Sequence, residues 1–214
     1  MKKIILLVLI CCPFISSNAQ WDLSMSMGLD LKYAPSYRDY VNYTYTQTGN
    51  KLSSFSTAIN FSGEVGYLIS ENFQMGFEYG IQIDSYNSSA GPGGVYEISY
   101  LHHRPSILAY YVLPGSGYKI KFGGGFGYRY ISLEEKIISK TDYSASGFGF
   151  VIKTEGNTQL GKNLFALIGL NLRYDFPGEP ESSNGKKIFN PGNNENVSMN
   201  SLNVGINLGI TYTF

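Results

Sequence analysis

Residues 201–214 alternate between apolar and small or polar side chains at every position. The apolar positions are Leu202, Val204, Ile206, Leu208, Ile210, Tyr212 and Phe214. A period of two is the side-chain repeat of a β-strand. A strand in a globular protein usually has about 3–10 residues, whereas a strand that crosses a bilayer obliquely needs roughly 9–11. The pattern therefore favours a membrane-spanning strand, with Tyr212 and Phe214 at the membrane interface.

The same alternation marks seven earlier segments, so that the predicted strand count is eight. These segments are 21–33, 55–69, 73–84, 96–112, 118–133, 144–160 and 164–176. The fourth segment is the least regular, and Pro105 in its middle predicts a bulge or another irregularity. A count of ten is the alternative, because Val41, Tyr43 and Tyr45 repeat the alternation within residues 34–54 and would extend the first hairpin.

The connections between these segments alternate in length. Tight turns follow the second, fourth and sixth segments, at residues 70–72, 114–117 and 161–163. Long polar connections follow the other segments, at residues 34–54, 85–95, 134–143 and 177–200. Short periplasmic turns and long outer loops are typical of outer-membrane barrels. An even strand count places both termini on the periplasmic side.

The two faces of the predicted strands differ in character. One face is uniformly large and apolar, while the other carries glycine, serine, asparagine and charged residues. Eight strands leave an interior only wide enough for side chains to fill. We therefore predict an all-β fold, an eight-stranded antiparallel up-and-down transmembrane β-barrel with its apolar face outward. A soluble lipocalin-like barrel, with the apolar face around an internal cavity, is the alternative.

The N-terminus has the pattern of a secretory signal peptide. Lys2 and Lys3 precede an apolar run over residues 4–12, and small residues lead to Ala19. This arrangement predicts cleavage after Ala19, so that residues 1–19 are removed and residues 20–214 form the barrel domain. An uncleaved membrane anchor and a lipoprotein acylated at Cys11 or Cys12 are the alternatives.

Charge and cysteine content narrow the function classes. The whole chain has 16 basic and 16 acidic residues, and removal of Lys2 and Lys3 leaves 14 against 16, a net charge of −2. No basic stripe indicates a nucleic-acid partner. Both cysteines lie in the leader, so we expect neither a disulfide nor a thiolate site in the mature chain. His102 and His103 are adjacent and point to opposite strand faces, so we predict no metal site and no cofactor.

The terminal sequence ITYTF, the eight-strand alternation and the loop rhythm resemble OmpA/OmpX-type small outer-membrane barrels. Residues 98–130, ISYLHHRPSILAYYVLPGSGYKIKFGGGFGYRY, resemble the PorT-like outer-membrane barrel family of Bacteroidetes, in which a strand with a Tyr-Leu start and a central proline leads by a tight turn into a glycine-rich strand. The resemblance implies a location in the bacterial outer membrane, in contact with its lipid and lipopolysaccharide. It implies insertion by the barrel-assembly machinery, which reads a terminal aromatic such as Phe214, and it implies no enzymatic activity.

Charged residues on the polar face are the candidate interior residues. An unpaired charge in a low-dielectric interior costs several kcal/mol, so we expect ion pairs. The predicted ion-pair residues are Glu64, Glu78, Lys121, Arg129 and Arg173. Glu64 and Glu78 lie on neighbouring strands, and the three cations are their expected partners. A structural plug is one interpretation, and a gated proton or ion path opened by exchange of partners is the other.

The only two histidines suggest one catalytic arrangement. His102 and Ser106 share a strand face, and with Glu97 they suggest a hydrolase like the lipid A deacylases, which use a Ser-His-Glu arrangement. Four residues span about 13 Å along an extended strand. This distance is too long for the hydrogen bond between a nucleophile and its base. We therefore predict no catalytic residues.

The loops are the remaining candidates for function. Tyr37, Tyr40, Tyr43 and Tyr45 form either a binding surface or part of the interfacial aromatic girdle. We predict a monomeric barrel with a structural or surface-interaction role through loops 34–54 and 177–200. A small channel or transporter for ions or hydrophobic solutes is the main alternative, followed by a membrane-embedded lipid-modifying enzyme.

Overall fold

Eight long strands form a closed barrel in the computed structural model, which describes residues 21–45, 51–89, 95–136 and 139–214. The strands are β1 (Trp21–Tyr33), β2 (Ser56–Ser70), β3 (Phe73–Ser89), β4 (Val95–Gly115), β5 (Tyr118–Lys136), β6 (Lys140–Gln159), β7 (Leu164–Phe176) and β11 (Ser201–Thr213). The predicted signal peptide, residues 1–19, lies outside the described residues.

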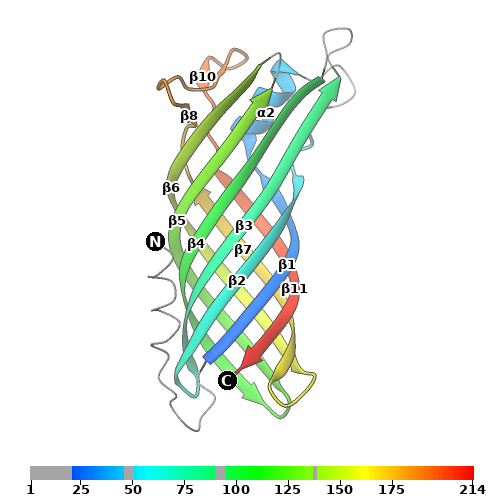
Figure 1. Cartoon of the computed structure of the whole chain (residues 1–214), viewed down its shortest axis with the longest axis vertical. Coiled ribbons are helices and arrows are strands. Elements are labelled where there is room, and N and C mark those ends of the chain that lie inside the picture. The colour runs from blue at the N-terminus through cyan, green and yellow to red at the C-terminus, as the bar shows by residue number, and fades with distance from the viewer. Residues whose placement is uncertain (1–20, 46–50, 90–94, 137–138) are drawn as a thin grey trace, which may run out of the picture.

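Each long strand pairs antiparallel with two neighbours, which confirms the predicted up-and-down barrel. β1 pairs with both β2 and β11, and β5 pairs with both β4 and β6, so the ring has no open edge. Closure gives every strand two hydrogen-bonded neighbours, as a chain in hydrocarbon requires. Helix α2 (Pro35–Thr44) and the short strands β8 (Glu181–Ser182), β9 (Phe189–Asn190) and β10 (Glu195–Asn196) lie at the end opposite the C-terminus (Figure 1).

The apolar face of the strands points outward and forms a continuous band. Leu208, near the middle of β11, is 60% exposed and lies beside Met27 and Ile168 of the two neighbouring strands. Aromatic residues border the band at both ends. The border near the C-terminus includes Trp21, Tyr118, Tyr212 and Phe214, and the border near the loops includes Tyr33, Tyr130, Phe148 and Phe176. An exposed apolar band between two aromatic girdles fits a bilayer. The lipocalin-like alternative is wrong, because the interior at this level is polar.

The hairpins β3–β4 and β5–β6 are longer than predicted and extend beyond the band. Their strands have 17, 21, 19 and 20 residues, compared with 13 to 15 in the other four. Outward side chains become polar above Tyr130 and Phe148, where Ser132, Ser146 and Ser144 follow. Backbone pairing continues, and the alternation inverts: Ile131, Leu133, Tyr143 and Ala145 of the extensions point inward and are buried, while the outward positions are polar.

The bulge or irregularity predicted at Pro105 takes the form of an interruption in the β4–β5 pairing at residues 104–106. Arg104, Pro105 and Ser106 pair with consecutive residues of β3, and the register with β5 is the same before and after the proline. Proline removes one backbone donor and leaves the strand extended. Gly127 of β5 passes so close to the Pro105 carbonyl that a Cβ there would collide with it. The register shift in the β2–β3 pair instead falls between Leu68 and Ser70, next to a tight turn.

The ten-strand alternative is also wrong, because residues 35–44 form helix α2. Pro35 stands at the first helical position, where its missing N–H is no loss. Tyr37, Tyr40 and Val41 are buried on one helix face, as the spacing i, i+3, i+4 requires. The alternation of Val41, Tyr43 and Tyr45 is therefore a coincidence within a helical pattern.

A charge placed in the middle of the outer band tests the orientation of the barrel. We expect Leu208→Arg to lower the free energy of unfolding in lipid vesicles by about 2–4 kcal/mol, because the guanidinium would lie near the bilayer midplane. Ser132→Arg, beyond the aromatic border on β5, is the control and should change it by less than about 1 kcal/mol. Urea titration of both variants measures the difference. Equal effects would mean that the band does not lie in hydrocarbon.

Candidate functional site in the barrel interior and at the loop end

The interior at the level of the apolar band is filled by charged side chains. Toward the loops, Arg104 contacts both Asp30, at 2.9 Å from Nη1, and Asp175, at 3.4 Å from Nε. Arg129 forms a second ion pair with Asp175. The side chains of these four residues are at most 2% exposed. Each carboxylate is therefore compensated inside the barrel rather than by solvent.

Lys153 is the centre of the middle group. Its Nζ lies 2.9 Å from Glu64, 2.7 Å from Glu78 and 2.8 Å from Glu155. Arg173 contacts the second oxygen of Glu78 at 2.7 Å, and the Tyr110 hydroxyl donates to Glu64 at 2.8 Å. One lysine thus connects strands β2, β3 and β6.

A third group lies nearest the chain termini, around Asp22. Lys121 contacts one carboxylate oxygen of Asp22 at 3.0 Å, and Lys119 contacts the other at 3.1 Å. The Thr213 hydroxyl donates to Asp22 at 2.8 Å. The interior is therefore occupied by ion pairs along the height of the band.

The five predicted interior residues all lie inside the barrel, but their partners differ from those expected. Arg173 contacts Glu78, as expected. Lys121 and Arg129 instead pair with Asp22 and Asp175. The predicted set did not include the interior charges Asp22, Asp30 and Arg104. Their positions on the polar strand face were the signal that could have identified them.

The interior charges divide between the two halves of the chain. Strands β1 to β3 supply mainly acids, namely Asp22, Asp30, Glu64, Glu78 and Asp84. Strands β4 to β7 supply mainly bases, namely Arg104, Lys119, Lys121, Arg129, Lys153 and Arg173. Among the described residues, six of the eleven interior ion pairs cross from one half of the ring to the other. The other five stay within one half, through Lys32 with Asp84 and through the two acids of the basic half, Glu155 and Asp175.

An apolar cluster closes the interior at the loop end. Tyr37, Tyr40 and Val41 of α2 pack there against strands β4 and β5 and against the last loop. Those partners include Ile98, Tyr100, Ile131, Leu133, Ile188, Val197 and Met199. Tyr37 and Tyr40 therefore belong neither to a binding surface nor to the girdle, and both of those expectations are wrong for them. Tyr43 is exposed.

Glu135 anchors this cluster through tyrosine hydroxyls. It accepts hydrogen bonds from Tyr40 at 2.5 Å, and from Tyr45 and Tyr96 at 3.2 Å each. Burial, together with the bond to Glu135, raises the pKa of Tyr40, and burial raises the pKa of Tyr45 to about 12. Both hydroxyls therefore keep their protons at neutral pH and donate to the carboxylate.

The residues considered for catalysis are not assembled. His102 and Ser106 are buried in the interior with Arg104 between them. The Nδ1 atom of His102 accepts from Arg104 at 3.3 Å, and Ser106 Oγ accepts from Arg129 at 3.2 Å. Glu97 is exposed. Among the described residues, no three histidine, cysteine or acidic side chains come together as a metal site.

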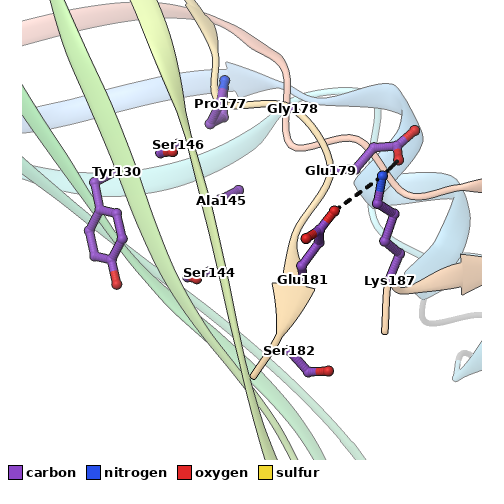
Figure 2. Close-up of a pocket in the computed structure, with 10 residues that line it drawn as sticks. All are labelled: Tyr130, Ser144, Ala145, Ser146, Pro177, Gly178, Glu179, Glu181, Ser182 and Lys187. Atoms are coloured by element: carbon purple, nitrogen blue, oxygen red, sulfur yellow. Dashed lines mark ion pairs between the residues drawn. The ribbon is translucent and has the colours of Figure 1, made fainter. Parts of the chain in front are cut away.

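A hollow on the outer surface lies between β6 and the last loop (Figure 2). Its volume is about 610 Å³. Its lining residues are Tyr130, Ser144, Ala145, Ser146, Pro177, Gly178, Glu179, Glu181, Ser182 and Lys187. We call it the loop-end pocket. Lys187 contacts Glu179 at 2.9 Å and Glu181 at 3.2 Å across its far wall (Figure 2).

The sequence matches no protein-family model and no curated protein. Solved structures match over nearly the whole chain. Neisserial surface protein A has a TM-score of 0.53 at 11% identity and covers 91% of this chain and 97% of its own. A major outer membrane protein from Thermus thermophilus has a TM-score of 0.52 at 14% identity, with coverage of 91% and 99%. Ail, the attachment invasion locus protein of Yersinia pestis, was solved with the heparin analogue sucrose octasulfate; it has a TM-score of 0.51 at 12% identity, with coverage of 91% and 99%.

These similarities show the fold. The chain is an eight-stranded antiparallel transmembrane β-barrel, similar to the small outer-membrane barrels of the OmpA/OmpX type. Among the described residues, no helix is both long and apolar enough to cross a membrane.

Removal of the central interior cation should destabilise the barrel. We expect Lys153→Met to lower the free energy of unfolding by about 3–5 kcal/mol, because it leaves Glu64, Glu78 and Glu155 without their shared partner. Lys119→Met is the control, since Asp22 keeps Lys121, and it should cost less than about 1 kcal/mol. Urea titration in vesicles compares the two variants. A loss no larger for Lys153→Met would contradict the role given to its ion pairs.

Loss of the Glu135 carboxylate should loosen the apolar cluster without unfolding the barrel. In Glu135→Ala, three tyrosine hydroxyls lose their acceptor, so trypsin should cut faster after Arg38 and Lys51 in the refolded protein. Glu134→Ala is the matched control, because Glu134 is partly exposed and forms its ion pair with exposed Lys140. Cleavage is followed by mass spectrometry. The same rate in both variants would show that Glu135 does not hold α2.

Proposed function

We propose that this chain is a non-enzymatic protein of the bacterial outer membrane that acts through its extracellular loops. The observation that carries the proposal is the contrast between a closed interior and a folded loop end. The interior is filled by ion pairs and covered by the α2 cluster. The last loop, by contrast, is held in a defined shape against β6 and presents polar side chains outward.

The defined conformation of the last loop favours a role in binding a partner over a role as a simple connection between strands. Fixing the backbone of one residue in a single conformation costs about 1–2 kcal/mol of conformational entropy. A loop that only connects two strands does not need to be fixed in this way. Here β8 pairs with β6, Val197 donates to the Ile188 carbonyl at 2.8 Å, and Val197 and Met199 are buried. A rigid surface loses less entropy on binding a partner.

Biogenesis and partners follow from the same proposal. The chain reaches the periplasm with residues 1–19 as a cleaved signal peptide. The barrel-assembly machinery recognises its terminal Tyr212 and Phe214 and inserts it as a monomer in contact with outer-membrane lipid and lipopolysaccharide. The likeness of residues 98–130 to the PorT-like barrels of Bacteroidetes supports membership of that family. Surface proteins among its structural neighbours, including Ail with its heparin-analogue complex, are consistent with a role at the loop end.

A channel is the second candidate, and unsatisfied interior groups favour it. Buried polar atoms without a hydrogen-bond partner in the structure occur from one end of the band to the other. They include Gln74 Oε1, Arg173 Nη1, Gln82 Oε1, Arg104 Nη2 and His102 Nε2. Buried polar atoms of this kind are commonly satisfied by ordered water. A hydrated column of this kind would conduct ions or protons only if the α2 cluster opened.

Surface labelling tests the proposed location and orientation. The predicted mature chain has no cysteine. A cysteine introduced by mutation is therefore its only thiol that a maleimide can label. A membrane-impermeant maleimide should label Lys186→Cys in the last loop on intact cells. Gly161→Cys, in a tight turn with open space around it, should be labelled only after lysis. Labelling of the turn variant on intact cells, or recovery of the protein outside the envelope fraction, would contradict the proposal.

Planar bilayers separate the two candidates. The wild-type protein should show no single-channel steps, because the α2 cluster closes the interior. Replacement of residues 35–44 by a short glycine-serine turn removes the helix from that cluster and tests whether the interior ion pairs alone keep the barrel closed. Steps in the wild-type protein that change in Lys153→Met would support the channel and overturn the loop-based proposal.

A further inference from the structure

The loop-end pocket lies immediately above the apolar band. Outward side chains of β6 change there from Phe148, which is 66% exposed, to Ser146 and Ser144. Tyr130 is the last outward aromatic of β5, and it lies across β6 from the loop residues of the pocket (Figure 2). The pocket therefore opens at the height of the lipid headgroups rather than into hydrocarbon or into the barrel.

Backbone contacts fix the walls of the pocket. Ser182 and Glu181 of β8 pair with Tyr143 and Ser144 of β6. Met199 donates to the carbonyl of Gly178 at 2.8 Å, and Gly178 takes a left-handed φ of 81° that turns the chain out of β7. Beyond the lower end of this pairing, the Phe176 carbonyl approaches β6 so closely that a Cβ at Gly147 would collide with it. The gap between β6 and the loop is thus a feature of the fold, and its volume of about 610 Å³ lies within the roughly 300–1,000 Å³ of small-molecule sites.

The lining chemistry is rich in hydrogen-bonding groups. Serine hydroxyls from β6 form one wall, and carboxylates and an ammonium from the loop form the other. Hydrogen bonds with Lys187 lower the pKa of Glu179, and bonds with Glu179 and Glu181 raise the pKa of Lys187. Glu179 and Lys187 are therefore charged at neutral pH, and with Glu181 the loop wall carries two carboxyl groups against one ammonium. Tyr130 adds an exposed aromatic ring with a hydroxyl at its edge.

The charge arrangement selects against anionic ligands. Lys187 is already shared by two carboxylates, so a phosphate or sulfate would meet an excess of negative charge. An apolar ligand would leave the lining donors and acceptors without partners. A neutral polyhydroxylated molecule fits both conditions, because its hydroxyls donate to the carboxylates and accept from Lys187 and the serines. Its C–H face can pack on the Tyr130 ring.

We propose that the loop-end pocket binds a neutral saccharide, with Tyr130 as the packing surface and Glu179, Glu181 and Lys187 as the hydrogen-bonding wall. This inference rests on the proposed loop-mediated function and names its ligand class. The saccharide comes either from a glycolipid headgroup of the same leaflet or from a free oligosaccharide in the medium. Both present the same chemistry to the pocket.

Binding is measured by isothermal titration of the full mature chain in lipid nanodiscs free of lipopolysaccharide. The probes are neutral trisaccharides of glucose, mannose and N-acetylglucosamine, with a sulfated disaccharide beside them. A second arm uses nanodiscs that contain either lipopolysaccharide with its complete core or lipid A alone, and measures thermal stabilisation of the barrel. Binding of a neutral trisaccharide indicates the free source, and stabilisation by complete lipopolysaccharide alone indicates the glycolipid source.

Variants assign the effect to the pocket. Tyr130→Ala and Glu181→Gln should each weaken the response roughly tenfold or more, as loss of a packing surface or of a charged hydrogen bond predicts. Tyr33→Ala is the matched control for Tyr130, because it is a border aromatic of similar exposure on β1, 37% against 39%. Glu134→Gln is the matched control for Glu181. Both controls should leave binding unchanged, and heat-modifiable gel mobility shows that every variant is folded.

Three results would overturn the inference: no response to any neutral saccharide or to complete lipopolysaccharide, a response to the sulfated disaccharide only, or equal loss in pocket variants and controls. None of these results would affect the surface labelling of Lys186→Cys. Failure of the saccharide site and failure of the proposed loop-mediated location are therefore distinguishable.

Discussion

The cost of leaving a polar group without a partner in hydrocarbon governs this structure. The backbone meets that constraint by closing the ring between β1 and β11, so that no strand edge faces lipid. The side chains satisfy the same constraint through their orientation: apolar residues point toward the lipid, and charged residues point into the barrel. The charges must then satisfy one another, and the ion pairs around Asp22, Lys153 and Asp175 do so along the height of the band.

The two ends of the interior are closed by different chemistry. Toward the termini, Lys119, Lys121 and Thr213 surround Asp22 with polar contacts. Toward the loops, the apolar cluster of α2 covers the charged interior, with Glu135 held by tyrosine hydroxyls. The strand extensions and the last loop contribute apolar residues to this cover and present polar residues on its outer side. A closed interior and an ordered outer surface together favour recognition at the loop end over transport through the barrel.

Sequence periodicity predicted the barrel because each face of a strand meets one environment, either lipid or interior. It failed where that condition does not hold. The extensions of β5 and β6 carry their apolar residues inward and their polar residues outward, the reverse of the membrane band. In α2, Val41 belongs to a helical face with Tyr37 and Tyr40, and its alternation with Tyr43 and Tyr45 has no structural meaning. Strand parity identified interior charges such as Glu78 but not their partners. Which charges form ion pairs depends on how far each side chain extends across the interior of the closed ring. Lys121 of β5, for example, contacts Asp22 of β1.

The excess of acids on β1–β3 and of bases on β4–β7 has a consequence for how the barrel enters the membrane. A half-formed sheet of the first three strands would carry uncompensated negative charge, and the remaining strands would carry the opposite excess. Neither half alone is electrically suited to a lipid environment. Neutrality arrives only when distant strands face one another, as Asp22 faces Lys121 and Glu78 faces Arg173. Insertion of this chain should therefore be all-or-none, with ring closure and charge compensation completed in a single cooperative event.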